Sequence, residues 1–142
     1  MIQRKQSLWL LVAALLNAGV FIFDLYRADV TVNGIADHKV LRVADHYPPL
    51  LIALVMTLLP VVTIFMFSNR KRQVGMSAVS MVGTLSFISM MLMRVKNISP
   101  APAAGSYWIG AVLPVAAVIF IVMAIVGIRK DEKLVRSVDR LR

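Results

Sequence analysis

Cysteine is absent from this sequence of 142 residues, which excludes disulfides, thiolate nucleophiles and cysteine-ligated metals. Acidic residues are few, with seven Asp and Glu against sixteen Lys and Arg, and histidine occurs twice. The sequence also lacks a nucleophile elbow, a phosphate-binding loop and a pair of carboxylates placed for acid–base chemistry. These absences predict a protein that is not an enzyme and that uses no cofactor.

Ionisable side chains are also missing from four long apolar runs, which together occupy most of the chain. A helix needs about 20 such residues to cross a bilayer core about 30 Å thick. The sequence is 59% hydrophobic and has a mean hydropathy of +0.79. We therefore predict an all-α integral membrane protein, with a single membrane domain over residues 1–142. Its expected spans are residues 7–23, 47–68, 75–93 and 106–128.

The basic residues are distributed unevenly along the chain. If each apolar run crosses the membrane once, eleven of the sixteen Lys and Arg fall on one side, in residues 4–5, 70–72 and 129–142. The positive-inside rule then places both termini in the cytoplasm. This predicts an antiparallel four-helix transmembrane bundle. The net charge of +9 is thus a topology signal, and no specific nucleic acid is predicted as a partner.

The longest segment outside the spans, residues 24–46, shows signs of β-structure. The β-branched residues 30–32, the Asn33-Gly34 pair and residues 40–43 predict a short hairpin, or two extended pieces around a turn. Because an isolated hairpin is marginally stable in water, it would lean on the helices or on a partner.

The other two connections are short. Residues 69–74 predict a tight turn, and residues 94–105 contain two prolines and a glycine that make helix improbable. Pro60 and Pro114 lie inside the second and fourth spans, where each removes a helical hydrogen bond and is expected to kink its helix.

The third span is rich in small and hydroxylated residues. Such residues let helices approach closely in lipid, so we place this span at the centre of the bundle or against a partner subunit. The candidate partner-binding residues on it are Ser77, Ser80, Gly83 and Thr84. The methionines around this face are interpreted as flexible packing residues in preference to a copper site, because no paired His or Cys accompanies them.

Polar residues in and near the spans are candidates for function. Asn17 is expected to donate to a hydroxyl or carbonyl on a neighbouring helix. Asp24 and Arg94 fall at the outer ends of spans, which argues against an ion-coupled pump. The repeats Asp37-His38 and Asp45-His46 are too far apart in an extended segment to share one metal ion, so we predict no metal site there.

The C-terminal tail, residues 129–142, is expected to continue the fourth span as a basic amphipathic helix. It could lie on anionic lipid or dock in a protein groove, and both readings stay open. Its apolar stripe, the candidate partner-binding surface, comprises Leu134, Val138 and Leu141. The candidates for contact with lipid headgroups are Arg136, Arg140 and Arg142.

The two ends of the chain together resemble one protein family. The start MIQRKQSLWLL and the ending IRKDEKLVRSVDRLR, residues 1–11 and 128–142, are similar to those of a bacterial family of small four-span inner-membrane proteins, domain of unknown function 4293. The similarity follows the order of the spans, and the tail is its most specific part. It implies a location in the bacterial inner membrane. It brings no activity and no catalytic residue.

Two functions remain from the sequence. The first is an accessory or scaffold subunit of a larger bacterial inner-membrane complex, with other membrane subunits and anionic lipid headgroups as partners. The alternative is a small carrier or binding protein for a neutral or lipid-like molecule, which would use the proline kinks.

Overall fold

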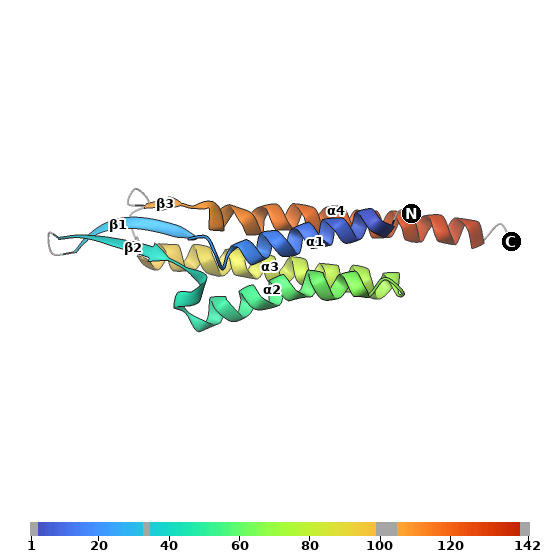
Figure 1. Ribbon diagram of the computed structural model, residues 1–142, viewed down its shortest axis with the longest axis horizontal. Helices are drawn as coiled ribbons and strands as arrows, with labels where there is room; N and C mark the ends of the chain where they lie inside the picture. The colour runs from blue at the N-terminus through green and yellow to red at the C-terminus, as the bar shows by residue number, and fades with distance from the viewer. Residues whose placement is uncertain (1–2, 33–34, 99–104, 140–142) are drawn as a thin grey trace.

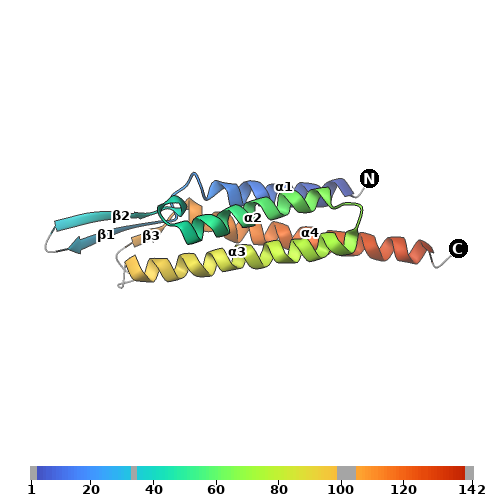
Figure 2. The same ribbon diagram turned by 90° about the horizontal axis from the view of Figure 1, so that it is seen from below.

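The computed structural model describes residues 3–32, 35–98 and 105–139. This part of the chain forms four long helices and one small sheet (Figure 1). The elements in chain order are α1 (Gln3–Gly19), β1 (Tyr26–Val32), β2 (Ile35–Leu41), the 3₁₀ turn η1 (Val43–Asp45), α2 (Tyr47–Phe65), α3 (Arg70–Ile98), β3 (Gly105–Tyr107) and α4 (Ile109–Asp139). The helices lie side by side along the long axis, and the sheet lies at the end opposite both termini (Figures 1 and 2).

The four helices form a closed ring of neighbours. Helix α1 packs against α2 and α4, and α3 packs against the same two helices. One of the two apolar clusters lies where α1 meets α4, with Ala13 and Ala117 fully buried at its centre. The Trp9 and Phe120 rings stack across the same pair of helices, with their centroids 5.6 Å apart. Small residues thus pack between these two helices at the centre, and stacked aromatic rings fill the interface beside them.

Three of the helices are long and apolar enough to cross a membrane. They are α2, the segment Arg70–Asn97 of α3 and the segment Ile109–Val135 of α4. Helix α1 has 17 residues and is not among them. It ends at Gly19, four residues before the expected end of the first span at Phe23, and a hydrogen-bonded turn follows it.

Two predicted connections are shorter than expected. Helix α3 begins at Arg70, so the prediction of a turn over residues 70–74 is wrong. The Asn69 side chain accepts a hydrogen bond from the Arg72 amide at 3.2 Å and thus caps the helix early. The helix also continues through residues 94–98, where we predicted none. By contrast, the predicted helical continuation of the fourth span is confirmed, because α4 extends to Asp139.

The predicted hairpin is confirmed and belongs to a larger sheet. Strands β1 and β2 pair antiparallel from Tyr26↔Leu41 to Val32↔Ile35, on either side of the Asn33-Gly34 pair, which lies outside the described residues. The fold is therefore mostly helical and not all-α, because β3 adds a third strand in the order β2-β1-β3. Sequence patterns missed β3, since three residues carry no recognisable alternation.

A single polar side chain joins three helices in the middle of the ring. Asn17 of α1 is fully buried, and its Nδ2 donates to the Met56 carbonyl oxygen of α2 at 2.9 Å and to Thr84 Oγ1 of α3 at 3.4 Å. The Met56 carbonyl is available because Pro60, four residues later, has no N–H to donate to it. The prediction that Asn17 donates to a carbonyl or hydroxyl of a neighbouring helix is confirmed.

This geometry predicts that Asn17 and Pro60 are energetically coupled. Asn17→Ala should lower the free energy of unfolding by about 1–2 kcal/mol, as expected for interhelical hydrogen bonds in lipid. In a Pro60→Ala background the helix can satisfy the Met56 carbonyl itself, so the cost of Asn17→Ala should fall. A double-mutant cycle measured by reversible unfolding in mixed detergent checks this.

The matched control for that cycle uses the proline of α4. In a Pro114→Ala background the cost of Asn17→Ala should equal its cost in the wild-type protein, because Asn17 makes its hydrogen bonds to α2 and α3. Equal costs in all three backgrounds would contradict the coupling.

Candidate functional site

The sheet has one buried face and one polar face. Along β1, Tyr26 and Ala28 are buried, while Arg27 and Asp29 between and after them are exposed. The buried side chains join an apolar cluster that includes Met91 and Val95 of α3. This alternation is the two-residue period of a strand whose sheet is covered on one side. The polar face is therefore available for binding.

A carboxylate between two guanidinium groups lies beside this face, at the junction with the helices. Asp24 Oδ2 accepts from Arg27 Nε at 2.9 Å and from Arg27 Nη2 at 2.5 Å, and Asp24 Oδ1 accepts from Arg42 Nε at 2.7 Å. The Asp24 side chain is only 9% exposed. The hydrogen bonds from Arg27, and then those from Arg42, lower the pKa of Asp24 below its ordinary value of 3.8. We call these three residues the Asp24 clamp.

The clamp is fixed to the start of α4. The Arg27 guanidinium carbon lies 3.8 Å from the centroid of the Trp108 ring, a cation–π contact. The Trp108 amide donates to the Leu25 carbonyl at 3.1 Å, and the Gly110 amide donates to the Asp24 carbonyl at 3.2 Å. A Cβ on Gly110 would lie 2.6 Å from that same carbonyl oxygen, so the approach requires glycine.

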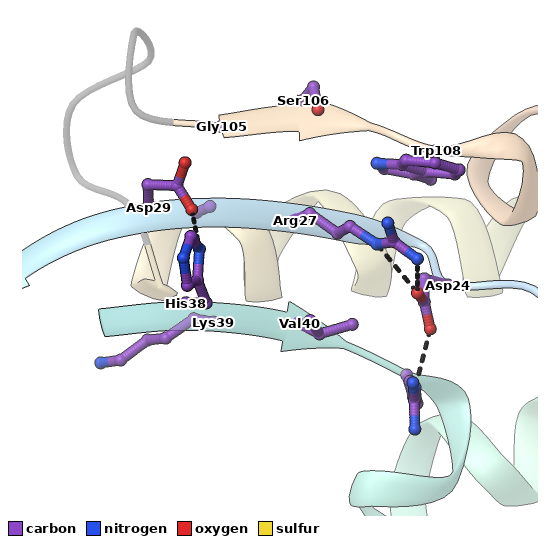
Figure 3. Close-up of a pocket in the computed structure, with 11 residues that line it drawn as sticks. Asp24, Arg27, Asp29, His38, Lys39, Val40, Gly105, Ser106 and Trp108 are labelled. Atoms are coloured by element: carbon purple, nitrogen blue, oxygen red, sulfur yellow. Dashed lines mark hydrogen bonds and ion pairs between the residues drawn. The ribbon is translucent and has the colours of Figure 1, made fainter. Parts of the chain in front are cut away.

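An open groove of about 630 Å³ runs over the clamp and the polar face. Figure 3 shows Arg27 and Asp24 pointing toward each other beside Trp108, with His38 and Asp29 forming a second contact farther along β1 and β2. The cationic side chains that line the groove are Arg27, Lys39 and Arg42. The lining also contains the carboxylates of Asp24 and Asp29, so it carries charges of both signs.

The predicted absence of a metal site concerns the two Asp-His repeats. No group of three or more metal-ligating His, Cys, Asp or Glu side chains occurs among the described residues. His38 contacts Asp29, whereas His46 stands directly before α2 as its N-terminal cap. The side chain of Asp37 lies outside the described residues.

One comparison with known proteins identifies the family. The family model described as domain of unknown function (DUF4293) matches residues 2–141. The chain belongs to this family. No curated protein and no solved structure matches the chain. This match confirms the family that the two ends of the chain resemble. The description of the family assigns no activity.

In this DUF4293 protein, the small-residue face of α3 is turned inward. Ser77, Ser80 and Thr84 are fully buried inside the ring of helices. Gly83 is half-buried, and a Cβ added to it would lie 4.0 Å from the Cβ of Met56. The helix α3 is itself one of four members of the ring and is not at its centre, but this face of it points into the bundle. The prediction that these residues bind a partner remains untested, but a partner would meet α3 through its exposed side chains.

The tail residues are only partly described. Leu134 is exposed on α4. Arg136 and Val138 belong to the same helix, but their side chains lie outside the described part, and so do residues Arg140, Leu141 and Arg142 entirely. The predicted roles of these residues in docking and in lipid contact remain predictions.

Sequence reasoning missed two polar links at the end of the bundle that holds the termini. Gln6 Nε2 of α1 donates to Asp131 Oδ2 of α4 at 2.5 Å, and both side chains are buried. Gln73 Nε2 of α3 donates to the Thr63 carbonyl of α2 at 3.3 Å. Both glutamines sit within a few residues of a span boundary, and that position was the only signal available in the sequence.

The Asp24 clamp predicts an acid-sensitive junction. Because the pKa of Asp24 is lowered on folding, its contribution to stability is complete above its ordinary pKa of 3.8 and is lost as the pH falls through the lowered folded value. Asp24→Asn should therefore lower the thermal midpoint at pH 7, and its difference from the wild type should shrink below about pH 4. Thermal unfolding followed by circular dichroism in detergent measures both.

The control for this prediction is Asp29→Asn, which removes an exposed carboxylate of the same face outside the clamp. It should change the midpoint at pH 7 much less than Asp24→Asn. A gap between wild type and Asp24→Asn that is the same at pH 7 and pH 3 would contradict the role of the clamp.

Proposed function

We propose that this protein is a non-catalytic accessory or scaffold subunit of a bacterial inner-membrane complex. Its four helices then form an antiparallel transmembrane bundle with both termini in the cytoplasm. One observation supports this most directly: large apolar side chains are exposed on all four helices, and several polar side chains are buried among the apolar ones inside the bundle. Examples of the exposed apolar side chains are Leu8, Leu15, Leu51, Phe65, Val82 and Ile119.

Such extensive exposure of large apolar side chains, together with buried polar ones, is not typical of a water-soluble helical protein. Asn17, Thr63, Ser77, Ser80 and Thr84 are all fully buried. Exposed apolar patches of this extent are unfavourable in water and suit lipid or a partner protein. Helix α1 fits the same placement, because the exposed apolar residues 21–23 in the turn after Gly19 lengthen its apolar surface. The sheet and its groove are then extracytoplasmic, because the basic ends of the chain lie at the opposite end of the bundle (Figure 1).

The contacts with a partner are assigned to two surfaces. One is the exposed apolar side of α3, which includes Val79, Val82 and Leu85. The other is the extension of α4 beyond Asp131, where Leu134 and Val135 are exposed on a helix that projects past the other three (Figure 2). Anionic lipid headgroups are the expected neighbours of the basic residues of this extension.

A second candidate function is a carrier or binding protein for a lipid-like molecule. The observation in its favour is an open apolar groove of about 330 Å³ between α1 and α2. It is lined by Ser7, Leu8, Leu11, Val61, Ile64 and Phe65. An acyl chain fits such a lining, and a lone purified protein that retains a lipid there would favour this candidate over the subunit.

The membrane placement is testable by cysteine labelling, because the natural chain contains no cysteine to give a background. Lys39→Cys on the sheet should react with a membrane-impermeant maleimide in intact spheroplasts. Lys71→Cys, at the start of α3, should react only after the membrane is permeabilised. Leu15→Cys, on the outer side of α1, should resist the reagent until detergent is added. Labelling of Lys71→Cys in intact spheroplasts would overturn the proposed topology.

The subunit function is testable by gentle purification of the tagged protein from native membranes, where a stoichiometric partner is expected. Replacing Leu134, Val138 and Leu141 with Ser should release that partner, because each fully buried apolar side chain contributes about 1.5–3 kcal/mol. Replacing Arg136, Arg140 and Arg142 with Gln should chiefly weaken attraction to anionic lipid, by about 1 kcal/mol per charge. If only the Gln variant releases the partner, the tail is a lipid anchor and not a docking element.

A further inference from the structure

The Asp24 clamp leaves strong hydrogen-bond donors on the floor of the groove. Asp24 accepts from Nε and Nη2 of Arg27 but only from Nε of Arg42. The two terminal nitrogens of Arg42 are not used in that bond, and its side chain is 64% exposed. A guanidinium presents these N–H groups as a planar fork that matches two oxygens of a phosphate. The carboxylate thus orients Arg42 for a second anionic ligand.

The charges of the groove favour such a ligand. Arg27, Lys39 and Arg42 contribute three positive charges to its lining, against two carboxylates, Asp24 and Asp29. One of those carboxylates is already satisfied by the two arginines, and the other contacts His38. The lining therefore keeps a net positive charge, and the negative charge of a phosphate placed beside Arg42 would offset it.

The position of the groove favours the phosphate of a lipid headgroup as its ligand. Trp108 directly precedes α4, and Tyr47 is the first residue of α2; both rings are exposed at the end of the bundle next to the sheet. Trp and Tyr concentrate at membrane interfaces, at the depth of the lipid headgroups. Ile109 and Val112, the first exposed apolar side chains of α4, follow Trp108 along the helix. With the membrane placement proposed above, the clamp lies at the level of lipid phosphates, and the apolar surface beside it is available for the acyl chains.

We propose that Arg42 and Arg27, flanked by Trp108, bind the phosphate of an anionic phospholipid of the extracytoplasmic leaflet. This site rests on the membrane placement proposed above and is separate from the lipid contacts predicted for the cytoplasmic tail. It assigns the sheet a role at the membrane surface, because the lipid would hold the junction between the sheet and α4 against the bilayer.

The test measures binding of phosphatidylglycerol to the purified protein in detergent. A Trp9→Phe background leaves Trp108 as the only tryptophan, so its emission reports on the groove, and native mass spectrometry counts the lipids retained. Arg42→Gln should weaken the affinity at least about tenfold, since hydrogen bonds to charged groups contribute that much or more. Arg42→Lys, which keeps the charge but loses the fork, should give an intermediate affinity.

The matched control is Lys96→Gln, which removes one exposed positive charge near the end of α3, outside the groove lining. It should leave both the Trp108 response and the retained lipid unchanged. Equal losses in Lys96→Gln and Arg42→Gln would mean unspecific charge attraction and overturn the site. Retention of the wild-type affinity by Arg42→Gln, with an unchanged circular dichroism spectrum, would overturn it as well.

Two further outcomes concern the occupant. Displacement of the lipid by millimolar inorganic phosphate would mean that the site recognises a free anion, which contradicts a lipid. A protein that copurifies with the wild type and is lost with Arg42→Gln, while lipid binding is unchanged, would make the groove a protein interface instead. Because this assay is done in detergent, its failure is distinguishable from a failure of the cysteine-labelling test of membrane placement.

Discussion

The hydrogen bond from Asn17 to the Met56 carbonyl is the contact on which the arrangement of the helices depends most. In lipid, apolar side chains gain little by moving from the bilayer to a helix interface, so packing and polar contacts decide which helices associate. Pro60 leaves the Met56 carbonyl without its helical donor, and Asn17 supplies one from α1 at 2.9 Å. The same amide reaches Thr84 of α3. The Asn17 side chain thus links three helices by hydrogen bonds.

The two ends of the bundle are held by different polar contacts. Near the termini, Gln6 joins α1 to α4 through Asp131, and Gln73 joins α3 to α2. At the sheet, the Asp24 clamp and the backbone bonds from Trp108 and Gly110 join the segment after α1 to the start of α4. Between the ends, the outer surface is apolar. The described part of the chain is therefore a helical bundle with apolar flanks, and different polar contacts hold its two ends.

Where sequence reasoning succeeded, a local pattern carried the information. The Asn33-Gly34 pair between β-branched residues was sufficient for the hairpin, and the polarity of Asn17 was sufficient for the type of its partner. Reasoning failed where a contact came from a distant segment. Strand β3 exists because residues 105–107 meet residues 26–28, and Asp131, which reads as a surface charge of the tail, is buried because Gln6 lies opposite. Residues 94–98 are helical although we predicted no helix there, because the prolines that follow them end the helix only after Ile98.

The sequence by itself determined the apolar spans, the basic ends and the family, because hydropathy, charge and motif are properties of consecutive residues. Only the tertiary structure decided which polar groups meet. Asp24 and Arg27 are three residues apart, but an entire hairpin separates them from Arg42, and nothing in that spacing says that one carboxylate lies between two guanidinium groups. The register of β1 with β2 brings Arg27 and Arg42 to the same end of the sheet, and the turn after α1 brings Asp24 between them. The groove follows from that register, which only the folded chain establishes.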